Sequence, residues 1–427
     1  MQQEKQTLIK NVRFFDPVTH QKKHMNILLQ NGIVRDFSSD ISLTADRTID
    51  LGGACVCPAF IDMDSSLCDP GQEYREDIVT GTRAAISGGY GALFSAVPSV
   101  TSYDELKAIE YMEKKANTRG FCKVFPIASV TAETDFEKLK SHHILAVGND
   151  GSNASDEQIY RAMKRCKEND ILFISASENP SFESTGVVND GKVSDFLGLP
   201  GIPNAAESAE TARMISLAAS AGCRLHLSCI STKESVDIVR VAKSYGIAVS
   251  AATCPQYFSL TEDDVFFYGS AAKTLPPLRS KADTEAIIEG ICDGTIDVIS
   301  TRHRPCAEYE KKRPVSQAAF GMIGLQSAFA VSYTYLVAQG YIDIYRLINL
   351  LSSSAAKITG LISNGYGTLC IGTPISLCVF STNKELILSR SNIQSKSFNT
   401  PYLGMSLLGT VDRIFLGDQY YRLGENS

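Results

Sequence analysis

Side chains that bind metal ions or move protons in enzymes follow several apolar, strand-like runs of this sequence. Three of these runs are FIDMDSS (60–66), RLHLSCIS (224–231) and IDVISTR (296–302). Asp64 and Cys229 lie near the ends of the first two, and His303 and Cys306 follow the third. Carboxylate, thiolate and imidazole groups are common ligands of zinc in proteins. Brought together, these four side chains would form an unorthodox metal site.

The same residues also have a structural interpretation. A free cysteine is commonly a small buried apolar residue, so Cys229 is expected to pack in the core and Cys306 to be a loop thiol. His226 and His303 are expected to make structural hydrogen bonds, because the usual partners of a catalytic histidine are absent. Asp62 is expected to organise the loop after its strand rather than to do chemistry.

Between residues 57 and 361, strand-like runs alternate with helical patterns. The eight strand-like runs are 60–66, 91–99, 123–129, 143–149, 171–177, 224–231, 247–253 and 296–302. The helical patterns are 77–88, 155–169, 208–222, 232–246 and 284–294, and several end at glycine. Eight such units predict an α/β fold, a (β/α)₈ TIM-like barrel with its functional groups at the carboxyl ends of the strands. A doubly wound sheet is the alternative, but no GxGxxG motif follows the first strand.

Both ends of the chain contain short strand-like segments bounded by turn residues. Neither 1–56 nor 362–427 has enough strands for a stable sheet of its own. We therefore expect one small β-sandwich domain, built from both chain ends, beside a barrel that spans 57–361.

The composition excludes several functional classes. The 427 residues contain 47 acidic and 41 basic side chains, and this net charge of −6 argues against a nucleic-acid-binding surface. No apolar run is long enough to span a membrane, and the first residues lack the apolar core of a signal peptide. The 12 cysteines contain no CxxC pair. Free thiols in a reducing, cytoplasmic compartment are expected.

Several runs resemble the dihydroorotase family of the amidohydrolase superfamily, in family order along nearly the whole chain. They are PAFIDMDSSLCDPGQEYREDIVTGTRAAISGGYGALFSAVPS (58–99), HLSCIST (226–232), KTLPPLR (273–279), DGTIDVISTRHRPC (293–306), GMIGLQSAF (321–329), SAAKITGL (354–361) and NTPYLG (399–404). The resemblance implies an amidohydrolase barrel descended from enzymes that hydrolyse a cyclic amide bond.

In that family, a His-x-His pair at the end of the first strand binds catalytic zinc, and a zinc-bound hydroxide attacks the ring amide. This sequence has Asp64 and Ser66 at those two positions. Cys68 replaces the arginine that binds the substrate carboxylate, and Ser99 replaces a substrate-binding asparagine.

The later family positions are altered as well. The bridging acidic ligand corresponds to Asp150 or to the neighbouring Asn149, and two zinc-binding histidines correspond to Ala176 and Cys229. A substrate-contacting asparagine is replaced by Leu275.

The eighth strand carries the sharpest change. Arg302 stands where the family has its catalytic aspartate, His303 is retained, and a later histidine becomes Cys306. A guanidinium stays protonated at biological pH and cannot act as a general base. We expect Arg302 to pair with Asp64 or Asp150, so that charge-assisted hydrogen bonds replace metal–ligand attraction.

The resemblance and these substitutions together predict a non-catalytic structural or regulatory homologue in pyrimidine biosynthesis, with no catalytic residue, metal or cofactor. The resemblance implies aspartate carbamoyltransferase as a partner and self-association into a homo-oligomer; no nucleic acid or membrane partner is expected. One alternative is an active cyclic-amide hydrolase with a remodelled zinc site at Asp64, Asp150 and Cys229. The other is a sensor that holds an anionic small molecule at Arg302.

Overall fold

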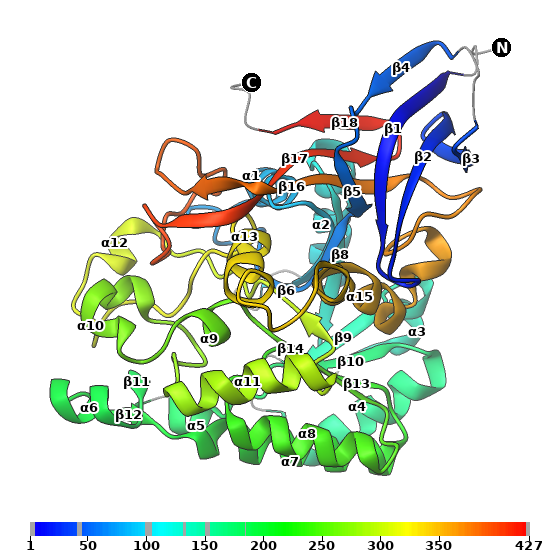
Figure 1. Ribbon diagram of the computed structural model, residues 1–427. Helices are drawn as coiled ribbons and strands as arrows, with labels where there is room; N and C mark the ends of the chain where they lie inside the picture. Colours follow the sequence, from blue (N-terminus) through cyan, green and yellow to red (C-terminus); the bar gives the residue numbers. More distant parts are fainter. Residues whose placement is uncertain are drawn as a thin grey trace.

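The computed structural model describes residues 5–40, 45–98, 105–130, 134–149, 154–183 and 185–423 (Figure 1). Its centre is a sheet of eight parallel strands in the order β15-β14-β13-β10-β9-β8-β7-β6. These strands are β6 (Phe60–Ser65), β7 (Tyr90–Ala96), β8 (Lys123–Ser129), β9 (Ala146–Asn149), β10 (Leu172–Ser175), β13 (Leu225–Leu227), β14 (Val249–Thr253) and β15 (Val298–Ile299). Each lies within or overlaps one of the eight predicted runs, so the predicted barrel is confirmed.

The sheet closes into a barrel between its first and last strands. Ser65 forms a parallel bridge with His303, and the Ser66 amide donates to the His303 carbonyl at 2.9 Å. On the same seam, the amide and hydroxyl of Thr301 donate to the two carboxylate oxygens of Asp62 at 2.8 and 2.5 Å. Asp62 therefore ties the first strand to the end of the eighth, rather than organising only its own loop.

Helices surround the barrel (Figure 1). The longer ones are α1 (Ile78–Ser87), α2 (Glu105–Arg119), α4 (Asp156–Asn169), α7 (Asn204–Ala221), α8 (Lys233–Ser244) and α11 (Lys281–Asp293). Shorter ones are α3 (Phe136–Ser141), α5 (Pro180–Glu183), α6 (Lys192–Leu197), α9 (Gln256–Ser259), α10 (Asp264–Tyr268), α12 (Glu308–Lys311), α13 (Ala328–Ser332), α14 (Ile344–Ile348) and α15 (Ser354–Thr359).

Two of the long helices begin earlier than the apolar periodicity predicts. Helix α11 starts at Lys281 because the Ser280 side chain accepts a hydrogen bond from the Asp283 amide and caps the first turn. Helix α7 starts directly after Pro203, whose restricted backbone suits a helix start. In both cases polar and small residues of the first turn extend the helix beyond its apolar stripe.

The two chain ends combine into one sheet domain, as predicted. Its strands are β1 (Gln6–Asp16), β2 (Gln21–Gln30), β3 (Ile33–Ser38), β4 (Arg47–Asp50), β5 (Cys55–Pro58), β16 (Ser376–Ile387), β17 (Ser406–Leu416) and β18 (Gln419–Arg422). The two ends meet where β5 pairs antiparallel with β16, with Cys57 opposite Cys378. Figure 1 shows β1 and β2 running across the direction of β16 and β17. Buried side chains from both ends, such as Ile27 and Leu377, share one apolar cluster.

A short parallel pair, β11 (Val188–Asn189) and β12 (Gly201–Ile202), lies outside both large sheets. Across the part of the chain described above, no helix has the length and apolar character needed to cross a membrane.

Candidate functional site

A cavity of about 220 Å³ lies at the carboxyl ends of the barrel strands. We call it the mouth cavity, and its lining includes Ser66, Cys68, Ala176, Glu178, Arg302 and Arg304. Four of these residues were singled out from the sequence, and they come from three different strand ends. The fold therefore brings these four separated positions together, where barrel proteins usually place function.

Arg302 is buried at the mouth and paired with the first strand. Its Nη1 donates to Asp64 Oδ2 at 2.8 Å, and its Nε donates to the Leu275 carbonyl at 2.7 Å. The expected ion pair between Arg302 and Asp64 is thus present. Leu275 contributes its backbone oxygen to this arrangement.

Two further charged groups complete the arrangement. Arg302 Nη2 forms an ion pair with Glu178, and Arg304 Nη2 forms one with the other oxygen of Asp64. Burial alone would raise the pKa of Asp64, but the charges of Arg304 and Arg302 outweigh burial and hold the pKa below its usual value. Two guanidiniums and two carboxylates therefore balance each other at the mouth.

Three residues other than glycine have a left-handed backbone conformation around this cavity. Cys68, Ser177 and Arg302 have φ angles of +57°, +49° and +45°. Such left-handed conformations are uncommon outside glycine, and they tend to cluster where a structure positions functional groups.

His303 is turned away from the mouth cavity. Its Nδ1 accepts a hydrogen bond from the Gly324 amide at 3.2 Å, so Nε2 carries the proton and faces Glu76 Oε2 at 3.4 Å. Glu76 also accepts hydrogen bonds from Thr80, Ser395 and the Lys396 amide. Burial would raise the pKa of Glu76, yet the hydrogen bonds from His303 and these partners keep it below its usual value. His303 is therefore buried between the Gly324 amide and the Glu76 carboxylate.

The NTPYLG run braces the loop that carries the arginines. Asn399 Nδ2 donates to the Arg304 carbonyl at 2.9 Å, and Asn399 Oδ1 accepts from the Cys306 amide at 3.1 Å. The Cys306 thiol is buried and points to the Phe320 carbonyl at 3.3 Å. A segment from the end of the chain thus sets the position of Arg304.

Cys229 and His226 lie in the buried core of the barrel. The Cys229 sulfur is 3.4 Å from the sulfur of Cys254, and burial raises the pKa of both thiols. His226 Nδ1 lies 2.9 Å from the Ser250 hydroxyl, and burial lowers the pKa of this imidazole to about 3. Both residues are fully buried.

The resemblance implies zinc, and the described residues do not fit that ion. Both oxygens of Asp64 are bound by guanidiniums, and Ser66 and Ala176 cannot replace imidazole ligands. Arg302 is a cation and cannot bind a metal ion. Cys229, His303 and Cys306 each face other partners and do not converge with Asp64. Among the residues that the structure describes, no group of three or more His, Cys, Asp or Glu side chains is arranged to hold a metal ion.

Two of the positions named from the sequence, Ser99 and Asp150, lie outside the described residues. Sequence reasoning missed Glu178, Arg304 and Glu76. A signal for Arg304 was present, because it follows Arg302 by two residues in the same loop, and Glu178 follows Ala176 in the same way.

Comparison with known proteins gives a consistent result. A family model described as dihydro-orotase-like matches residues 53–235. The dihydroorotase of Thermoanaerobacter sp. (strain X514) is 38% identical over 394 residues, which cover 91% of this chain and 90% of that protein. The chain belongs to the dihydroorotase family. The dihydroorotase of Elusimicrobium minutum (strain Pei191) is 36% identical and covers 96% of both chains.

Solved structures share the architecture of this dihydroorotase-family chain. The L-hydantoinase (dihydropyrimidinase) of Arthrobacter aurescens superposes with a TM-score of 0.89 at 21% identity, covering 98% of this chain and 96% of that one. The dihydropyrimidinase of Brevibacillus agri NCHU1002 gives a TM-score of 0.87 at 21% identity, covering 99% and 96%. At this identity the likeness concerns the amidohydrolase fold.

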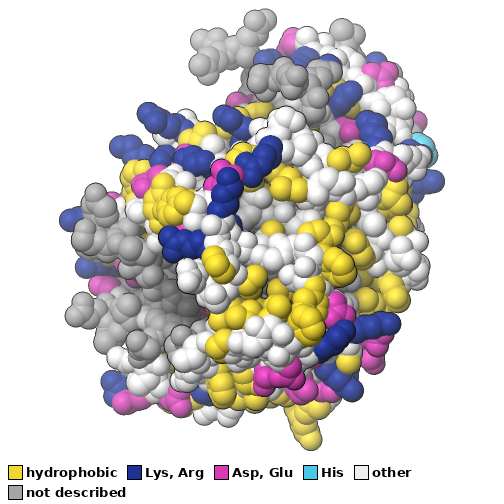
Figure 2. All heavy atoms as spheres, turned by 90° about the vertical axis from the view of Figure 1, so that its left-hand side faces the viewer, with side chains coloured by type: hydrophobic (Ala, Val, Ile, Leu, Met, Phe, Trp, Pro, Cys, Tyr) yellow, Lys and Arg dark blue, Asp and Glu magenta, His cyan; other side chains and the backbone are white. Residues whose placement is uncertain are grey.

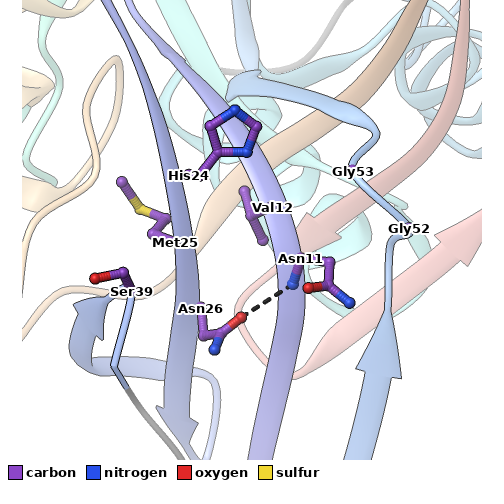
Figure 3. A pocket seen from close by; sticks show the side chains of 8 residues that line it. All are labelled: Asn11, Val12, His24, Met25, Asn26, Ser39, Gly52 and Gly53. Atoms are coloured by element: carbon purple, nitrogen blue, oxygen red, sulfur yellow. Dashed lines mark hydrogen bonds between the residues drawn. The ribbon is translucent and has the colours of Figure 1, made fainter.

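A second hollow of about 380 Å³ lies on the sheet domain of this dihydroorotase-family protein (Figure 3). It lies beside the irregularity in β1 at Asn11, whose amide donates to Asn26 Oδ1 at 3.0 Å. Of its described lining residues, His24 alone has a titratable side chain, and that side chain is exposed. The arrangement provides no set of converging catalytic groups.

Proposed function

We propose that this member of the dihydroorotase family does not hydrolyse cyclic amides and acts as a structural or regulatory protein of pyrimidine biosynthesis. The ion pair of Arg302 with Asp64 carries the proposal. A permanent cation occupies the position of the general base, and it binds the carboxylate that stands at a ligand position. The same charge makes the mouth unfavourable for a divalent cation.

Metal analysis combined with an activity assay tests the loss of hydrolysis. Protein purified without chelators is expected to carry well under one zinc ion per chain and to leave dihydroorotate and carbamoyl aspartate unchanged. About one or two tightly bound zinc ions per chain, together with turnover, would instead establish the alternative of an amidohydrolase with a remodelled site.

The proposal includes a protein partner. Some inactive dihydroorotase-like proteins are structural partners of aspartate carbamoyltransferase, and we extend that role to this chain in the cytoplasm. Co-expression with the aspartate carbamoyltransferase of the same organism should give a complex that survives size-exclusion chromatography. Separate elution, with carbamoyltransferase activity unchanged by this protein, would contradict the partner.

An exposed apolar patch supports self-association as well. Phe196 and Phe267 are 78% and 81% exposed, and the rings of Phe196 and Phe266 pack edge to face at 5.3 Å. Helices α6 and α10 lie on the left of Figure 1, the side that faces the viewer in Figure 2, where hydrophobic side chains gather on the lower part of the surface. Exposed patches of this kind commonly mark protein interfaces.

Sedimentation velocity tests this part of the proposal. The full chain is expected to sediment as an oligomer, and the double variant Phe196→Glu/Phe267→Glu should sediment as a smaller species. Tyr245→Glu is the matched control, because Tyr245 is also 81% exposed but lies after α8. A monomeric wild-type protein, or equal effects of patch and control variants, would contradict the role of the patch.

A further inference from the structure

We infer that the mouth cavity binds a small monocarboxylate on Arg302 and Arg304, and that Glu178 is a built-in competitor for this ligand. The inference goes beyond the proposed loss of hydrolysis and depends on neither zinc nor a protein partner. It rests on the cavity, on the exposure of the two guanidiniums and on the balance of charges around them.

The two arginines differ in how firmly they are held. The Arg302 side chain is only 4% exposed, and its three nitrogens contact the Leu275 carbonyl, Asp64 and Glu178. The Arg304 side chain is 30% exposed and lines the cavity, with contacts to Asp64 and to the His303 carbonyl. Arg304 therefore presents an accessible guanidinium edge to the cavity. The Arg302 guanidinium is buried at the base of the cavity, and its contacts hold it in place.

Glu178 is the least buried carboxylate of the mouth. Its side chain is 12% exposed, against 8% for Asp64, and it contacts only one of the two arginines. It also follows the left-handed backbone of Ser177, so a short loop carries it. An incoming carboxylate can take its place on Arg302 while Glu178 moves to water, whereas Asp64 is held from both sides.

The charge balance favours a carboxylate over a phosphate. Two guanidiniums face two carboxylates, so exchanging Glu178 for one singly charged carboxylate leaves the mouth neutral. A phosphate dianion would bring excess negative charge next to the buried Asp64. The planar fork of a guanidinium also matches a carboxylate with two parallel hydrogen bonds.

The cavity limits the size and character of the ligand. Its volume of about 220 Å³ is below the range of roughly 300–1,000 Å³ that is usual for drug-sized ligands. Ala96, Val97 and Ala176 supply apolar walls, while Ser66 and Gln72 supply polar groups. A short or flat apolar body attached to one carboxylate fits this combination.

Calorimetric titration of the full chain with benzoate, propionate and inorganic phosphate tests the inference. Glu178→Gln removes the competing charge and should lower the Kd for benzoate or propionate at least tenfold. Arg304→Gln should raise that Kd at least tenfold. Arg213→Gln is the matched control, because Arg213 is 31% exposed and also holds two acidic partners, and it should leave the Kd within twofold.

The gain of affinity in Glu178→Gln keeps the test valid even if Arg304→Gln folds poorly. Failure of both carboxylates to bind wild type and Glu178→Gln, or an unchanged Kd in Glu178→Gln, would overturn the inference. Phosphate binding more tightly than both carboxylates would overturn the ligand class. Because none of these readings uses zinc or turnover, failure here is separate from failure of the proposed loss of hydrolysis.

Discussion

Arg302 donates from Nη1 to Asp64 Oδ2 at 2.8 Å and thereby joins the end of the eighth barrel strand to the end of the first. Asp64 receives a second guanidinium, that of Arg304, on its other oxygen. The Asp64 carboxylate thus pairs with both guanidiniums at the mouth. Its loss should leave both arginines without this counter-charge.

Replacing Asp64 by asparagine should destabilise the protein by about 3–5 kcal/mol, because it leaves two guanidiniums short of a counter-charge in a mostly buried place. Urea unfolding followed by circular dichroism measures the change. Asp237→Asn is the control: Asp237 pairs with Arg240 at the surface with 55% of its side chain exposed, so its loss should change stability by less than about 1 kcal/mol. Equal losses in the two variants would contradict the role of Asp64.

The contribution of Asp62 to the stability of the protein should depend on pH. Burial raises the pKa of this carboxyl to about 6, although the hydrogen bonds from Thr301 oppose the shift. The folded protein therefore holds the proton more tightly than the unfolded chain, and this contribution to stability is present below about pH 4 and is lost as the pH rises through 6.

The variant Asp62→Asn removes this titration. The stability of wild type relative to Asp62→Asn should fall by roughly 1–3 kcal/mol between pH 4 and pH 7. Urea unfolding at intervals over that range measures the difference. A constant difference would show that folding leaves the pKa of Asp62 unchanged, and one that grows in favour of wild type with rising pH would show that folding lowers it.

The contribution of Glu76 to stability should change with pH in the opposite direction to that of Asp62. Its pKa in the folded protein lies below the ordinary value despite burial, because His303, Ser395 and Thr80 bond to the carboxylate. Its contribution is present above the pKa of the unfolded chain and disappears as the pH falls through the folded value.

We therefore expect Glu76→Gln to destabilise the protein by about 1–3 kcal/mol at pH 7, with a smaller difference near pH 4. Glu157→Gln serves as a control, since Glu157 is 70% exposed and pairs with its helical neighbour Arg161. A loss in Glu76→Gln that stays constant with pH would mean that the charge of Glu76 contributes nothing.

Thiol accessibility provides a test of the packing. Of the twelve cysteines, only Cys292 and Cys370 are exposed, and Cys55 is half-buried. Ellman's reagent should modify two thiols per native chain rapidly and all twelve in urea. The variant Cys292→Ser/Cys370→Ser should lose the fast phase, whereas Cys229→Ser should retain it. More than three fast thiols would indicate that the buried cysteines are accessible.

Much of this architecture was predictable from local patterns. The barrel strands are apolar runs between polar or glycine boundaries, and such runs are recognisable without knowledge of their partners. The ion pair of Arg302 with Asp64 was also predictable, since Asp64 lies at the end of the first strand, Arg302 follows the eighth, and both strands end at the same rim of a parallel barrel.

The direction of loops was not predictable in the same way. Glu178 reaches Arg302 from a loop whose preceding residue, Ser177, has left-handed backbone, and nothing about serine favours that conformation. Glu76 bonds Ser395 across more than three hundred residues, and a single sequence carries no sign of that pairing. The side chains that complete the mouth were therefore missed, although the strands that support them were located.

The hydrogen bonds from Ser395 to Glu76 and from Asn399 to the Arg304 carbonyl have a consequence for the order of events during synthesis. A ribosome releases all eight strands of the barrel well before it adds these two residues. In the nascent barrel, Glu76 therefore lacks its hydrogen bond from Ser395, and the loop that carries Arg302 and Arg304 lacks its hydrogen bonds to Asn399. The rim can mature only after these two residues have been added, and a chain that stops before them would have a barrel rim without these hydrogen bonds.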